Sequence, residues 1–135
     1  MSRVALDTSL LVPALAPWHE ARAEALTLVR REVDVVPGHV LVETMSVLTR
    51  LPAPHRIAPG VVAAALAALP VRTIGLSADR YAPLLAAMAR VNVSGGALYD
   101  ALVAASALEH GATLLTRDVR AARTYEAVGV DFRIV

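Results

Sequence analysis

The 135-residue sequence contains no cysteine and no lysine, and few of its side chains are aromatic. Without cysteine the chain cannot form disulfides, bind zinc through thiolates or use a thiol nucleophile, and this composition is typical of a reducing, cytoplasmic location. Without lysine it cannot form a Schiff base or carry the lysine of a phosphate-binding P-loop. All 13 basic residues are therefore arginine. Against 12 acidic residues they leave a net charge of +1, so no global field attracts a polyanion.

Long apolar runs are also absent, although apolar residues make up 56% of the chain. The longest charge-free stretch, 57–71, has 15 residues and contains two prolines and a glycine. A membrane-spanning helix needs about 20 apolar residues, so we expect no membrane partner. The length and apolar content predict one domain that covers residues 1–135.

Short apolar segments alternate along the chain with segments of helical periodicity, which predicts an α/β fold built from parallel βαβ units. Strands are expected over residues 3–6, 33–36, 71–76, 113–116 and 132–135. Helices are expected over residues 10–15, 18–31, 39–51, 59–69, 81–90, 98–110 and 119–128. Gly111 and Gly129 each follow one of these helices and are placed to form left-handed C-terminal caps.

Four acidic residues occupy positions that parallel βαβ units would bring together. Asp7 and Asp118 each follow a strand, whereas Glu43 and Asp100 lie in apolar helices. Each position also has an ordinary structural explanation, because the first two can cap helices, Glu43 can lie at an exposed helix edge and Asp100 can interact with a helix dipole. In a parallel sheet, however, all four converge at the edge where ligands bind.

Four converging carboxylates repel one another unless a cation neutralises them. Divalent cations such as Mg²⁺ and Mn²⁺ prefer ligands that are all oxygen. The pattern therefore favours metal-dependent phosphodiester chemistry.

Other features leave alternatives open. Trp18, the only tryptophan, is expected to pack in the core rather than stack on a base. The alanine-rich segment 61–69 either packs internally against 39–51 or forms a surface for a partner. The arginines that neighbour Asp118 either contact phosphates or form a solvated helix face; they are Arg117, Arg120 and Arg123.

The residues around the four acids resemble the motifs of PIN-domain ribonucleases. These motifs are Asp7-Thr8-Ser9-Leu10-Leu11-Val12, Val40-Leu41-Val42-Glu43, Asp100-Ala101-Leu102-Val103-Ala104-Ala105 and Thr116-Arg117-Asp118. The chain length and the final Gly-Val-Asp-Phe segment look most like the VapC toxins of bacterial toxin–antitoxin pairs. The likeness covers essentially the whole chain.

This resemblance implies a three-layer α/β/α PIN-like domain with a central, mainly parallel sheet of about five strands. It implies a catalytic set of Asp7, Glu43, Asp100 and Asp118. Asp7 and Asp100 would bind Mg²⁺ or Mn²⁺ directly, while Asp118, also a metal ligand, and Glu43 would complete the pocket partly through water. Thr116 would orient Asp118. The cation would lower the pKa of a water molecule that attacks an RNA phosphate.

The resemblance also implies three partners: an RNA substrate, a cognate antitoxin and a second copy of the chain. The antitoxin would cover the acidic pocket and an apolar helical groove within 39–69. Two alternatives keep the fold, namely a nuclease of RNA maturation or decay and a catalytically silent binding module. A phosphatase of the haloacid dehalogenase type is disfavoured, because Ser9 stands where its second aspartate belongs and its lysine is missing.

Overall fold

The computed structural model describes residues 2–135, which form five strands, seven α-helices and two 3-10 turns. The strands are β1 (Arg3–Leu6), β2 (Val35–Pro37), β3 (Arg72–Ile74), β4 (Ala112–Thr116) and β5 (Phe132–Ile134). The helices are α1 (Thr8–Leu15), α2 (Arg22–Glu32), α3 (Gly38–Arg50), α4 (Pro59–Ala67), α5 (Tyr81–Arg90), α6 (Ala97–Glu109) and α7 (Ala122–Val128). The 3-10 turns are η1 (Ala78–Arg80) and η2 (Val119–Ala121). Within the described range, no helix has the length and hydropathy that crossing a bilayer requires.

The five strands pair in parallel, as predicted, but in two hydrogen-bonded sheets. One sheet has the order β1-β4-β5 and the other pairs β2 with β3. Asp34 joins the two sheets, because its N–H donates to the Val4 carbonyl at 2.8 Å and its Oδ2 accepts the Val4 N–H at 2.9 Å. A side-chain oxygen takes the place of a backbone acceptor at this junction. The ladder is therefore interrupted between β1 and β2.

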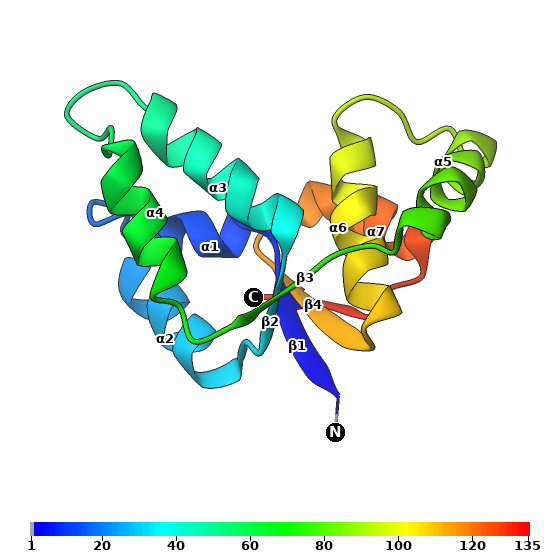
Figure 1. Ribbon diagram of the computed structural model, residues 1–135, viewed down its shortest axis with the longest axis horizontal. Helices are drawn as coiled ribbons and strands as arrows, with labels where there is room; N and C mark the ends of the chain where they lie inside the picture. Colours follow the sequence, from blue (N-terminus) through cyan, green and yellow to red (C-terminus); the bar gives the residue numbers. More distant parts are fainter. Residues whose placement is uncertain (1) are drawn as a thin grey trace.

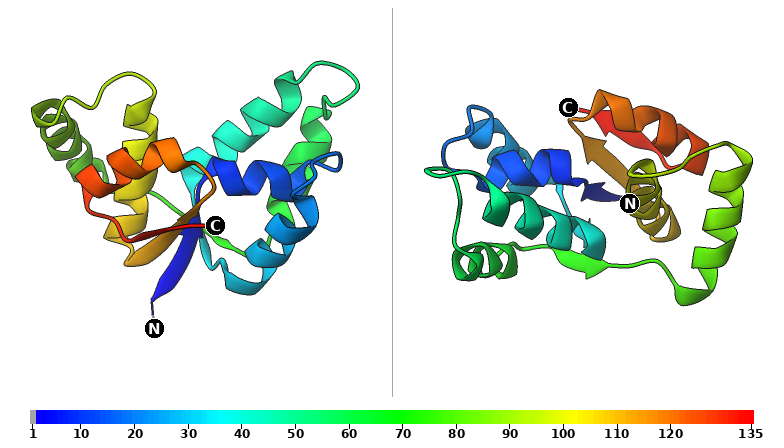
Figure 2. Two further views of the ribbon diagram at one scale, coloured as in Figure 1. Left: turned by 180° about the vertical axis from the view of Figure 1, so that it is seen from behind. Right: turned by 90° about the horizontal axis from the view of Figure 1, so that it is seen from above.

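Helices cover both sides of the strands (Figures 1 and 2). The first four helices, α1 to α4, lie on one side and α5 to α7 lie on the other. Parallel strands buried on both faces require apolar side chains on both, and β1 and β4 supply them. The largest fully buried core residues include Leu6, Leu10, Leu114, Leu115, Val36 and Tyr125. The predicted three-layer α/β fold is confirmed.

Every strand and α-helix expected from the sequence is present, with shifts of a few residues at the ends. The largest shift is in α2, which starts at Arg22 instead of Trp18. The preceding residues form turns in which His19 Nδ1 accepts the Ala21 N–H at 3.0 Å. The expected left-handed glycine caps are present, since φ is 64° at Gly111 and 90° at Gly129.

Trp18 does not pack in the core, so that prediction was wrong. Its ring is exposed and lies 4.6 Å from the ring of His55, between the centroids. The turn before α2 places it on the surface, beside the loop that joins α3 to α4.

Candidate active site

Asp7 lies where β1 ends and α1 begins. Its N–H donates to the Leu115 carbonyl of β4 at 3.1 Å, and its Oδ1 caps α1 by accepting the Ser9 N–H at 3.0 Å. The Ser9 hydroxyl donates to the same oxygen at 2.6 Å, and the Tyr125 hydroxyl donates to Oδ2 at 2.6 Å. Asp7 is only 5% exposed. The helix-capping explanation is correct, and it accounts for only one of the three bonds that hold this carboxylate.

Asp118 follows β4, the strand that neighbours β1. Its carboxylate caps η2 by accepting the Arg120 N–H at 3.0 Å. Its own N–H donates to Oγ1 of Thr116, the last residue of β4, at 3.0 Å. Thr116 therefore holds the backbone of Asp118 rather than its carboxylate.

Glu43 and Asp100 come from α3 and α6, which contact each other. The contact includes a stack between His39 of α3 and Tyr99 of α6, whose ring planes differ by 1° and whose centroids are 5.2 Å apart. His39 Nε2 also lies 3.5 Å from Oε2 of Glu43. Because Tyr99 precedes Asp100, this stack brings the two helix-borne acids into one region.

The four carboxylates share an electrostatic field. Burial, followed by the negative charges of Asp118, Glu43 and Asp7, raises the pKa of Asp100 to about 6, while His39 opposes this shift. Like charges and desolvation both disfavour an ionised carboxylate. A carboxyl perturbed in this way is a candidate functional group. The structure thus brings Asp7, Glu43 and Asp118 close enough to act on Asp100.

Tyr125 of α7 is a buried neighbour of this cluster. Burial raises the pKa of its hydroxyl far above the ordinary value, and the charge of Asp7 adds to the effect. The hydroxyl therefore stays protonated and acts as a donor. Its ring meets Phe132 edge-on, with centroids 5.7 Å apart.

The donor set suits a hard divalent cation, because all four groups are carboxylates and a cation would relieve the repulsion at Asp100. Asp7 retains an acceptor position for such a cation, since a carboxylate has about four and hydrogen bonds use three. In residues 2–135 no group of three or more His, Asp or Glu side chains is already arranged as a metal-binding cluster. Asp7, Asp100 and Asp118 are candidate ligands by chemistry and by their place at the ends of β1 and β4 and on α6.

Two residues of this region escaped sequence reasoning. Ser9 lies two positions after Asp7 in the first acidic motif, and a hydroxyl at that spacing is a local signal for such a bond. Tyr125 lies 118 residues from Asp7 and no spacing in the sequence connects them. Only the packing of α7 against the strands reveals that bond.

One arginine lies beside Asp118 at the surface, and two more follow or precede it closely in the sequence. Arg120 places its Nε 3.6 Å from Oδ1 of Asp118, while its side chain remains almost fully exposed. Arg117 and Arg123 are exposed as well. These three arginines form a local group of positive charge on a chain whose net charge is only +1.

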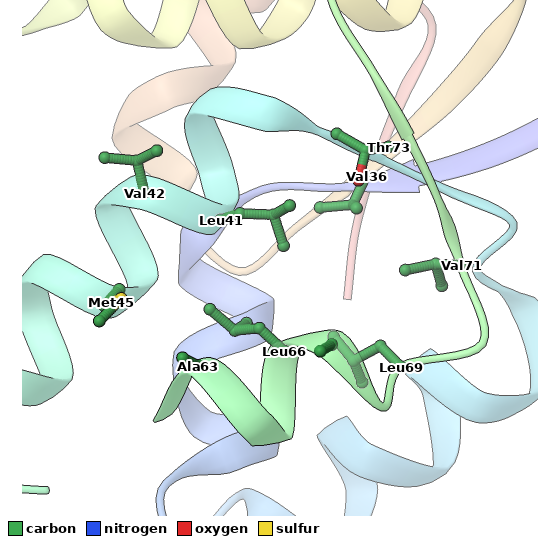
Figure 3. A pocket seen from close by; sticks show the side chains of 10 residues that line it. Val36, Leu41, Val42, Met45, Ala63, Leu66, Leu69, Val71 and Thr73 are labelled. Carbon is green, nitrogen blue, oxygen red and sulfur yellow. The ribbon is translucent and has the colours of Figure 1, made fainter. Parts of the chain in front are cut away.

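Two apolar hollows flank the site. The first, of about 350 Å³, lies between α3 and α4 (Figure 3), and Val42, Met45, Leu66 and Leu69 are among the side chains around it. The second, of about 590 Å³, lies between α5 and α6 and is lined by Leu84, Leu85, Leu98 and Leu102, with Tyr81, Gly95 and Tyr99. The alanine-rich helix α4 therefore packs against α3 and also lines an open groove.

Comparison with known proteins places the chain in a family. A family model described as the PIN domain matches residues 4–127. The chain belongs to the PIN-domain family. It is 47% identical over 133 residues to Ribonuclease VapC40 of Mycobacterium tuberculosis, and the aligned region covers 98% of each of the two chains. It is 42% identical over 127 residues to Ribonuclease VapC27 of the same organism, with 94% of this chain and 93% of the relative covered. Within the PIN family the chain therefore falls among the VapC proteins.

Solved structures agree with the PIN fold. VapC20 of Mycobacterium tuberculosis, described as a sarcin-ricin loop cleaving toxin, superposes with a TM-score of 0.71 at 21% identity, over 94% of this chain and 95% of that one. A DNA-bound VapBC from Salmonella typhimurium superposes with a TM-score of 0.69 at 22% identity, over 99% of this chain and 98% of that one. At these identities the likeness concerns the fold.

Proposed function

We propose that this PIN-domain protein is a metal-dependent endoribonuclease that acts as the toxin of a toxin–antitoxin pair. The observation that carries the proposal is the convergence of Asp7, Glu43 and Asp118 on Asp100, whose pKa is raised to about 6. The proposal is supported by two VapC relatives, 47% and 42% identical, that are named ribonucleases. It is also supported by the description of VapC20 as a toxin that cleaves the sarcin-ricin loop.

In this proposal Asp7, Asp100 and Asp118 are the ligands of Mg²⁺ or Mn²⁺. When bound, such a cation supplies neutralisation of phosphate charge and acidification of water. Glu43 completes the pocket from α3, and its 39% exposed side chain can accept a proton from water at the pocket mouth.

No side chain needs to act as a nucleophile. The Ser9 hydroxyl is the nearest candidate, but its proton is donated to Asp7 at 2.6 Å and its oxygen accepts the Arg117 N–H at 2.7 Å. The Arg117 N–H occupies a lone pair of the oxygen that would have to attack, and the two bonds together hold the hydroxyl in place. In this proposal water is the attacking group, and the reaction is a hydrolysis of the RNA backbone.

The RNA would contact the exposed arginines beside Asp118 through its phosphates, because the net charge of +1 provides no wider attraction.

The cytoplasmic location expected from the absence of cysteine stays a prediction.

The two apolar hollows suit the two protein partners of a toxin. An antitoxin helix would lay its apolar face into the groove between α3 and α4, the usual way in which an amphipathic helix docks. A second copy of the chain would cover the hollow between α5 and α6. The neighbour from Salmonella typhimurium is described as a DNA-bound VapBC, which supports an antitoxin partner.

The test compares the wild type with Asp100→Asn and with Glu126→Gln, an exposed control on α7. Each is incubated with bacterial total RNA in Mg²⁺, in Mn²⁺ and in EDTA, and each is expressed in a bacterial host while growth and RNA integrity are followed. We expect cleavage by the wild type and Glu126→Gln only when metal is present, together with growth arrest. Asp100→Asn should neither cleave RNA nor arrest growth.

Different failures have different meanings. Cleavage by the wild type in EDTA would contradict the metal dependence. Cleavage without growth arrest would favour a role in RNA maturation or decay. Folded protein that neither cleaves nor binds RNA would favour a binding module.

A further inference from the structure

Tyr125 and Asp7 are joined by a hydrogen bond of 2.6 Å that crosses the core between α7 and the end of β1. Both residues are buried, with Tyr125 1% and Asp7 5% exposed. A bond to an ionised carboxylate away from water is stronger than one at the surface. It therefore constrains the Asp7 carboxylate more than an exposed contact would.

The hydrogen bonds already made by each oxygen of the Asp7 carboxylate show which oxygen can face a cation. A carboxylate oxygen has two acceptor positions. On Oδ1 both are used, by the N–H and the hydroxyl of Ser9. On Oδ2 one is used, by Tyr125, and one is free. A cation bound by Asp7 therefore shares Oδ2 with the Tyr125 hydroxyl, and the direction of the free lone pair depends on that hydrogen bond.

The tyrosine is itself held in place from two directions. Its ring meets Phe132 of β5 at 5.7 Å, and β5 pairs with β4, the strand that leads to Asp118. Its helix α7 ends in the left-handed cap at Gly129. The ring is thus held against β5, the strand beside β4 that leads to Asp118.

We propose that Tyr125 is a positioning residue, which fixes the orientation of the Asp7 carboxylate and so presents Oδ2 to the divalent cation. This inference rests on the proposed function. It adds a residue from outside the acidic motifs, and it assigns the hydroxyl rather than the ring to this role. Loss of a hydrogen-bond partner of a metal ligand typically weakens metal binding or activity about 10- to 100-fold.

The test measures Mn²⁺ binding to the apo protein, by electron paramagnetic resonance of free Mn²⁺, for the wild type, Tyr125→Phe and Ser106→Ala. Tyr125→Phe keeps the ring and removes the hydroxyl. Ser106→Ala is a matched control, because Ser106 is also buried and donates a hydroxyl hydrogen bond, to the Leu102 carbonyl at 2.8 Å. Circular dichroism and thermal unfolding of each variant report on the fold.

We expect Tyr125→Phe to bind Mn²⁺ at least about tenfold more weakly than the wild type while remaining folded, and Ser106→Ala to bind with wild-type affinity. In RNA cleavage assays, the metal concentration that gives half-maximal activity should be higher for Tyr125→Phe than for the wild type. The KM for RNA at saturating metal should stay unchanged. A purely structural role would lower the unfolding temperature and leave the Mn²⁺ affinity unaltered, which would overturn the inference.

A measurement on the wild type keeps the proposal testable if Tyr125→Phe fails to fold. The buried hydroxyl proton of Tyr125 should give a solvent-protected proton resonance that moves during a Mg²⁺ titration, with the midpoint of metal binding. No movement on saturation would overturn the inference. Failure of the wild type to bind Mn²⁺ would overturn it together with the proposed metal dependence, whereas equal binding by the wild type and Tyr125→Phe would overturn this inference alone.

Discussion

Ser9 and Thr116, 107 residues apart in the sequence, lie with their hydroxyl oxygens 3.2 Å apart in a hydrogen bond. Its direction follows from proton counting. Ser9 donates its only hydroxyl proton to Asp7, so Thr116 must donate to Ser9 and use its oxygen to accept the Asp118 N–H. These bonds form one ordered chain from the carboxylate of Asp7 to the backbone of Asp118. The two acids at the strand ends are thereby held in register with each other.

Replacing Ser9 with alanine should break this chain. Asp7 loses one donor and the Arg117 N–H loses its acceptor, so we expect the free energy of unfolding to fall by about 1–3 kcal/mol. RNA cleavage should fall as well. Ser46→Ala, at an exposed position on α3, is the control. Urea denaturation measures the stability, and an RNA cleavage assay measures the activity. Equal stability of the two variants would show that the chain of bonds contributes nothing.

Replacing Asp100 with asparagine should stabilise the apo protein at neutral pH. The folded pKa of Asp100 is about 6 against an ordinary value of 3.8, so the folded state binds more protons between these values and wild-type stability rises as pH falls through 6. The asparagine side chain imitates the protonated, uncharged form of the carboxyl. The advantage of the variant should therefore be about 1–3 kcal/mol at pH 8 and should vanish near pH 4.

Urea denaturation in EDTA at several pH values measures this difference, with Glu126→Gln as the control. A constant difference across the pH range would contradict the shared field of the four acids. Addition of Mg²⁺ should stabilise the wild type and not Asp100→Asn, because ligand binding to the folded state raises its stability.

Replacing Val42 with glutamate should weaken antitoxin binding. Val42 lines the groove between α3 and α4 and is 70% exposed, so a charge there leaves the fold intact but would be buried by a docked helix. We expect an affinity loss of roughly tenfold or more. Val61→Glu on α4 is matched, because Val61 is 61% exposed and lies outside the residues that line the groove. Calorimetry with the cognate antitoxin compares them, and equal affinities would exclude this groove.

Replacing Leu85 with glutamate should shift the chain from dimer to monomer. Leu85 is 53% exposed and lines the hollow between α5 and α6, where a second copy would bury it. Sedimentation velocity of the wild type, Leu85→Glu and Val61→Glu measures the change. A wild type that sediments as a monomer, or a Leu85→Glu variant that stays dimeric, would contradict this interface.

Much of the fold was predictable because its signals are local. Strand β1 and helix α5 have the residues expected, since apolar runs and helical periodicity depend on neighbours in the sequence. Trp18 shows where local signals fail: its side chain is apolar, yet a turn closed by His19 places it on the surface. The division of the sheet at Asp34 was equally invisible, because a carboxylate that replaces a backbone acceptor leaves no pattern in the sequence.

The sequence by itself determined the α/β alternation, the left-handed caps at Gly111 and Gly129, and the four acids placed at strand ends and in helices. Only the tertiary structure decided which hydroxyls hold those acids and how strongly the acids act on Asp100. The physical reason is that periodicity and capping are short-range along the chain. A hydrogen bond from Tyr125 to Asp7, and the repulsion among four carboxylates, depend on distances that exist only after the helices pack against the strands.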